Sequence, residues 1–253
     1  MKKTNRVLIT FNQKKFIMKA YDEYHKFAEL KNRLPNFELK TIELNNGILA
    51  NHRMIDGKHI LSIDTNLYKL GDTALPYLFH EFTHLFDYET YFKGDKNQEM
   101  LLKFFTEYSA TQIEFMKILG FNTISDKINL TPNTILQSFN KIYTVEDYLL
   151  NERTGYINRI KSVIIERNMQ ELFDAFPYMM YYIGKISIII KNMGDIKEWN
   201  PLLFDYSDFC NMIGDECLKI IENLFQLQSV TIETLEPIIK LQLDVMRNFK
   251  PMQ

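Results

Sequence analysis

The chain is poor in the residues that interrupt regular structure. Its 253 residues include only 9 glycines and 7 prolines. Because these two residues are the main breakers of helices and strands, their scarcity predicts a helix-rich protein. Apolar residues make up 46% of the chain and charged residues 25%, which is ordinary globular usage and excludes disordered, collagen-like and coiled-coil chains. The length leaves room for one large domain or two small ones.

Cysteine is scarce as well, and positively and negatively charged residues are nearly equal in number. Cys210 and Cys217 are too few for a disulfide framework, and no histidine or third cysteine lies near them in the sequence. We therefore expect both to pack as small apolar residues rather than to bind a metal. The formal net charge is −2, which excludes a strongly basic surface and predicts no nucleic-acid partner.

Long hydrophobic runs are missing too. The apolar run at the N-terminus, Val7 to Phe11, is too short for a signal peptide and contains a threonine. The most apolar later stretch, Tyr178 to Ile190, is too short to span a bilayer and contains Lys185. These features predict a reduced, cytoplasmic protein without a membrane partner.

In the first part of the chain, the spacing of apolar residues changes from a helical repeat to the alternation of strands. Residues 14–33 repeat apolar side chains every three or four positions, which predicts a helix that Pro35 ends. Residues 37–43, 48–54 and 59–63 read as short strands, with turn signals at 45–47 and 56–57 between them. We expect these strands to form a small antiparallel sheet.

From residue 72 onwards the pattern is helical. Helices are expected at 72–92, 95–119, 131–142, 145–168, 170–192, 206–227 and 231–248. The predicted fold class is therefore α+β, a small antiparallel sheet with helices followed by a mostly helical second half. The polar segment 122–132 is the best candidate boundary, so the predicted regions are 1–121 and 122–253.

One motif carries chemistry: His80-Glu81-Phe82-Thr83-His84, an H-E-x-x-H within the expected helix 72–92. Histidines at positions i and i+4 of a helix project from one face, so both imidazoles can reach one metal ion. A glutamate at i+1 lies beside that face. It can hold a water molecule whose pKa zinc lowers, and it can take the proton as the water attacks a carbonyl. The motif predicts a zinc site with Glu81 as general base.

A catalytic zinc ion needs a third protein ligand and one open position. The third ligand should come from another element, because residues further along the same straight helix diverge from the ion. Glu107 is the preferred candidate, since it lies among apolar residues in the middle of the next helix. Burying a carboxylate in such a place is costly unless it has a partner. Glu114 shares its face and stays open as the alternative.

Other polar residues near the motif have more than one interpretation. Asp87 could orient a histidine or could be a solvated charge on the helix surface. His52 and His59 flank the expected hairpin turn, and we expect them at the surface rather than as ligands. The second half offers tyrosines that could stabilise an oxyanion, although packing is the expected role of most of them: Tyr143, Tyr148, Tyr156, Tyr178, Tyr181 and Tyr182.

H-E-F-T-H at 80–84 followed by Glu107-Tyr-Ser-Ala110 resembles the gluzincin pattern, H-E-x-x-H then E-x-x-A. More narrowly, it is similar to the ImmA/IrrE-type metallopeptidases, over about residues 36–118. This resemblance implies a zincin-like catalytic region at 1–121, closed by the helical region 122–253, and zinc bound by His80, His84 and Glu107, with Glu81 as general base. It also implies that strand 59–63 is an edge strand that pairs with an extended peptide or protein substrate.

The leading hypothesis is therefore a zinc-dependent metallopeptidase. Two alternatives stay open. The same residues could form a non-catalytic zinc-binding or partner-binding domain, which a fourth protein ligand in place of an open position would indicate. The chain could also be a helical interaction scaffold in which the motif occurs by chance, and such a scaffold would bind no metal.

Overall fold

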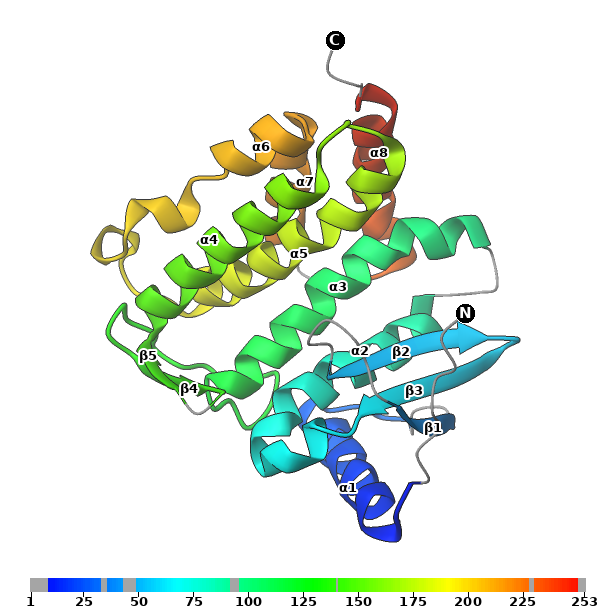
Figure 1. Ribbon diagram of the computed structural model, residues 1–253. Coiled ribbons are helices and arrows are strands. Elements are labelled where there is room, and N and C mark those ends of the chain that lie inside the picture. Colours follow the sequence, from blue (N-terminus) through cyan, green and yellow to red (C-terminus); the bar gives the residue numbers. More distant parts are fainter. Residues whose placement is uncertain are drawn as a thin grey trace. The chain divides into compact units, whose positions relative to one another are not determined.

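The computed structural model describes residues 9–32, 36–42, 49–91, 96–139, 141–227 and 230–249. It combines many helices with two small sheets, so the α+β class is confirmed at that level (Figure 1). The helices are α1 (Phe11–Phe27), α2 (Leu75–Tyr91), α3 (Lys96–Ile118), α4 (Val145–Val163), α5 (Met169–Asn192), α6 (Ser207–Ile213), α7 (Glu216–Gln226) and α8 (Ile232–Asn248). The strands are β1 (Phe37–Ile42), β2 (Ala50–Ile55), β3 (Lys58–Asp64), β4 (Ile135–Ser138) and β5 (Lys141–Thr144).

The chain packs as two compact units. The first consists of residues 1–90, 113–128 and 137–141, and the second of residues 91–112, 129–136 and 142–253. Helix α3 is continuous and contributes to both units. The boundary expected between residues 121 and 122 stays a prediction.

The first unit contains a three-stranded sheet in the order β1-β3-β2. β2 and β3 form an antiparallel hairpin whose turn residues, Asp56 and Gly57, both have the positive φ that a tight hairpin turn requires. β1 pairs with β3 in parallel. The expected antiparallel sheet is therefore wrong in part, because β1 lies on the far side of β3 instead of continuing the hairpin. The turn expected at 45–47 lies outside the described residues.

The order of the strands also corrects the expected edge strand. β3 is the central strand, and all of its residues except Lys58 are buried. Such a strand needs neighbours on both sides to satisfy its backbone groups, so residues 59–63 do not form an edge. Among the described strands of this sheet, β1 and β2 are the outer ones.

Aromatic side chains join α1 and α2 in the first unit. Tyr24 and Phe27 of α1 pack against Phe79 of α2, with ring centroids 5.4 and 5.2 Å apart. Helix α1 begins earlier than residue 14, because Thr10 and Gln13 form a capping box that satisfies backbone donors at its first turn. Pro35, the expected stop, lies outside the described residues.

Two expectations for the second half are wrong. Residues 131–142 are not a helix: Thr131 and Thr134 bond to each other in a turn, and the β4–β5 hairpin follows. Its residues include Ile135, Ile142 and Tyr143, which favour strands because their branched or aromatic side chains fit a pleated surface. The helix expected at 206–227 is two helices, α6 and α7, separated at Gly214, where φ is 133°.

Within the second unit, α5 packs against the segment of α3 that contains Glu107. A Cβ atom at Gly184 of α5 would lie only 2.8 Å from the carbonyl oxygen of Tyr108, so glycine permits the two helices to approach this closely. The Gln112 amide donates a hydrogen bond of 2.6 Å to the Ser187 hydroxyl. These contacts fix the position of α3 along α5 immediately after Glu107.

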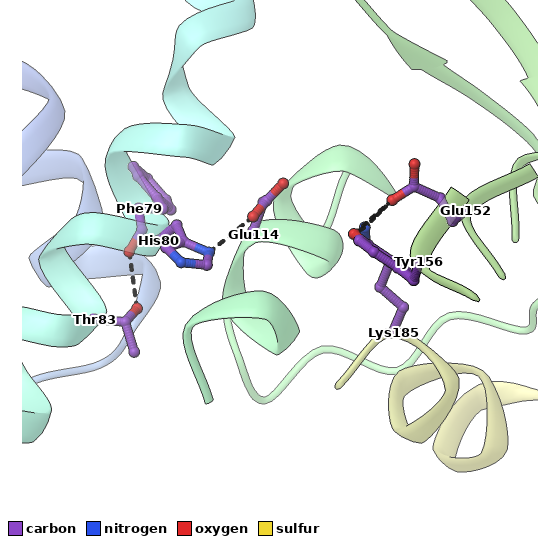
Figure 2. Close-up of polar contacts among 7 residues, drawn as sticks. All are labelled: Phe79, His80, Thr83, Glu114, Glu152, Tyr156 and Lys185. Carbon is purple, nitrogen blue, oxygen red and sulfur yellow. Dashed lines mark hydrogen bonds and ion pairs between the residues drawn. The ribbon is translucent and has the colours of Figure 1, made fainter. Parts of the chain in front are cut away.

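An ion pair between the buried Lys185 and the partly exposed Glu152 joins α4 and α5 in the same unit. The Lys185 ammonium group, whose side chain is 3% exposed, donates to the Glu152 carboxylate and, at 2.8 Å, to the Tyr156 hydroxyl (Figure 2). It also lies 5.5 Å from the ring centroid of Tyr148. Burial raises the pKa of Tyr156 well above its usual value, so this phenol stays protonated and donates to Glu152.

No helix in the described part of the chain is long and apolar enough to cross a membrane.

Candidate metal centre

Helix α2 presents the two motif histidines as the sequence predicts. It runs from Leu75 to Tyr91, with Pro76 in its first turn, where a missing N–H group costs nothing. The rings of His80 and His84 have centroids 4.8 Å apart and are nearly perpendicular to each other. His84 is buried, and the side chain of His80 is 13% exposed.

Glu114 of α3 orients the first of these histidines. Its Oε2 atom lies 2.8 Å from Nδ1 of His80 (Figure 2). Because an ionised carboxylate only accepts hydrogen bonds, Nδ1 carries the proton that His80 donates to Glu114. Glu114 therefore has the position of a carboxylate that supports a ligand histidine rather than that of the third ligand itself.

Glu107 is the carboxylate that could bind a metal ion together with the two histidines. The candidate ligand atoms of His80, His84 and Glu107 all lie within 4.8 Å of one another. Glu107 precedes Glu114 by seven residues, about two turns of the same helix, so both carboxylates share one face of α3. The three residues together could hold a metal ion.

Glu81 follows His80 directly in α2 and is only 9% exposed. Its Oε2 atom accepts a hydrogen bond of 2.6 Å from the backbone N–H of His52 on β2. The amide therefore points away from β3 and towards α2, which fixes the orientation of the Glu81 carboxylate. A motif search in the sequence cannot find this contact, since it joins residues 29 positions apart.

The expectation that His52 and His59 are surface residues is wrong. They are 8% and 3% exposed, and Nε2 of His52 lies 2.9 Å from Nδ1 of His59. Burial, followed by the nearby His84 and His59, lowers the pKa of His52 to about 3, so its ring is neutral at physiological pH. Four of the five histidines of the chain thus belong to α2 and to the β2–β3 hairpin.

A sequence signal for the position of His59 existed. His59 alternates with Leu61 and Ile63, which are fully buried, so the strand period places all three on one covered face. Asp87 is also buried, at 2% exposure, which makes the alternative of a solvated surface charge wrong. Its predicted role in orienting a histidine stays a prediction.

No known family model, curated protein or solved structure matches this chain.

Proposed function

We propose that the protein is a zinc-dependent metallopeptidase of the gluzincin type, most similar to the ImmA/IrrE family. The observation that carries the proposal is the group of ligand atoms from His80, His84 and Glu107 within 4.8 Å of one another. The E-x-x-A pattern from Glu107 to Ala110 supports it, because a small residue one turn after the ligand permits close helix packing, and Ala110 is fully buried.

The donor set fits zinc. Two imidazole nitrogens and one carboxylate oxygen are a known ligand set of catalytic zinc sites, which keep the fourth position for water or substrate. Bound there, zinc would act as a Lewis acid that polarises the substrate carbonyl and makes water more acidic. Glu114 would keep His80 in the tautomer that leaves its Nε2 atom for the metal.

Glu81 would serve as the general base. Its carboxylate would accept the proton of the attacking water and then transfer it to the nitrogen of the leaving amine. The His52 amide keeps this carboxylate in one orientation without contributing a titrating group. A fixed base is an advantage because proton transfer needs the donor and acceptor within hydrogen-bond distance at the moment of attack.

An extended peptide would be the substrate, bound beside β2. β2 is an outer strand among those described, and its His52 amide points away from β3 towards Glu81. An added substrate strand would therefore lie beside the general base. We therefore assign pairing with the substrate to β2 instead of β3, the strand for which the resemblance implied it.

A peptide library tests the proposal because it offers many different sequences for cleavage at once. Zinc-loaded protein is incubated with the library, and new chain termini are mapped by mass spectrometry. We expect cleavage that a chelator abolishes and added zinc restores. Bound zinc without any cleavage would favour the non-catalytic alternative.

The contact between Glu114 and His80 gives a separate prediction. We expect Glu114→Gln to weaken zinc binding about 10- to 100-fold, because an amide is a weaker acceptor for the proton on Nδ1 and no longer enforces one tautomer. Competition with a chromophoric chelator measures the affinity. Glu38→Gln, an exposed glutamate of β1, is the control, and equal affinities for the two variants would contradict the orienting role.

A further inference from the structure

A chain of hydrogen bonds begins and ends on α2 and passes through both strands of the hairpin. Oε1 of Glu89 on α2 lies 2.8 Å from Nε2 of His59 on β3. Nδ1 of His59 lies 2.9 Å from Nε2 of His52 on β2, and the His52 amide donates to Glu81 of α2. All four residues belong to the first unit.

The donors and acceptors in this chain follow from Glu89. An ionised carboxylate only accepts, so Nε2 of His59 carries the proton that it donates to Glu89. A His59 ring that carries its one proton on Nε2 accepts at Nδ1, and His52 then donates to it from its own Nε2. Both rings are therefore in the same tautomer, with the proton on Nε2, and each proton position depends on the carboxylate at the end of the chain.

The two rings occupy a covered position. His59 and His52 are buried, and the His52 ring packs edge-on against Tyr88 of α2, with ring centroids 5.2 Å apart. Glu89 is the exposed end, with a side chain 51% exposed. It is not a member of the group of candidate metal ligands, so it can influence the site only through the residues that it contacts.

We infer that Glu89, His59 and His52 form a positioning relay that holds the β2 amide on the Glu81 carboxylate. An outer strand is held by backbone pairing on one side only. Side-chain contacts therefore fix the position of the backbone groups along its other edge. The relay attaches β2 to α2 at a second point, about two turns beyond Glu81. Its catalytic consequence rests on the proposed function, and its structural part does not.

Nuclear magnetic resonance on protein labelled only with [15N]histidine tests the structural part. With five histidines in the chain, the ring nitrogens and the His52 amide can be assigned by substitution. We expect the proton on Nε2 in both His52 and His59. Glu89→Ala should shift the His52 amide resonance and mix the tautomers, whereas Glu89→Gln should retain both, because its side-chain oxygen can still accept from His59.

Thr90→Ala, an exposed substitution at the neighbouring position, is the matched control and should leave the spectrum unchanged. An unchanged His52 amide and unchanged tautomers in Glu89→Ala would overturn the relay. This measurement needs no substrate, so it decides the relay even if the protein cleaves no peptide.

Kinetics test the catalytic part. We expect Glu89→Ala to lower kcat about tenfold, with KM and zinc content unchanged, and Glu89→Gln to recover most of the activity. A contact that only stabilises the fold would not lower kcat while leaving KM and the zinc content unchanged. A shifted His52 amide together with an unchanged kcat would overturn the positioning role.

Discussion

Replacing Glu81 with glutamine is expected to lower kcat for peptide hydrolysis about 10²- to 10⁴-fold, which is the contribution of a positioned general base. Glutamine has almost the same shape, and its side-chain oxygen can still accept the hydrogen bond from the His52 amide. It cannot take a proton from water at neutral pH. Because Glu81 is not one of the candidate ligands, the zinc content should stay the same.

The comparison needs a charge-matched control and a metal measurement on the same samples. Glu38→Gln removes one exposed carboxylate from β1 and should keep full activity. Zinc per chain, measured for both variants, separates a lost base from a lost metal. If Glu81→Gln is as active as the unaltered protein, the assignment of the general base is wrong.

The second large effect is expected from the ion pair between Lys185 and Glu152 in the second unit. Glu152→Ala should lower the free energy of unfolding by about 3 kcal/mol, because it leaves the Lys185 ammonium group buried without its counter-charge. The same substitution removes an acceptor of the Tyr156 hydroxyl. Urea denaturation measures the change.

Two further variants separate the cost of an unpaired charge from lost packing. Lys185→Met combined with Glu152→Leu removes both charges and should be less destabilising than Glu152→Ala alone. Glu38→Ala, which breaks a pair with Lys40 at the surface, should cost less than about 1 kcal/mol. A double variant as unstable as Glu152→Ala would show that packing, not the buried charge, sets the cost.

The parts of the candidate site that depend on helix geometry could be predicted from the sequence. The spacing of His80 and His84 needs only the pitch of one helix, and α2 provides it. Glu107 could be singled out because a carboxylate amid apolar residues in the middle of a helix needs a partner. These three residues form a group that could hold a metal ion.

The parts that depend on strand pairing could not be predicted in the same way. Alternation identifies a strand and its covered face, but it does not say on which side of β3 the strand β1 pairs or in which direction. The contact between the His52 amide and Glu81 joins β2 to α2, and the residue pattern within a strand or a helix does not say which residues of the two meet, so it was not predictable either. The β4–β5 hairpin was missed because short apolar segments with turns read equally well as helix or strand.

The central claim is that His80, His84 and Glu107 bind one zinc ion, and metal content tests it most directly. Protein purified without chelator is analysed by plasma mass spectrometry, beside His80→Ala, Glu107→Ala and the control Glu38→Ala. We predict about one zinc ion per chain in the unaltered protein and in the control, and a loss of zinc in both site variants. Zinc kept by Glu107→Ala would contradict the third ligand, and an unaltered protein that binds no zinc, even after zinc is added back, would contradict the metal centre itself.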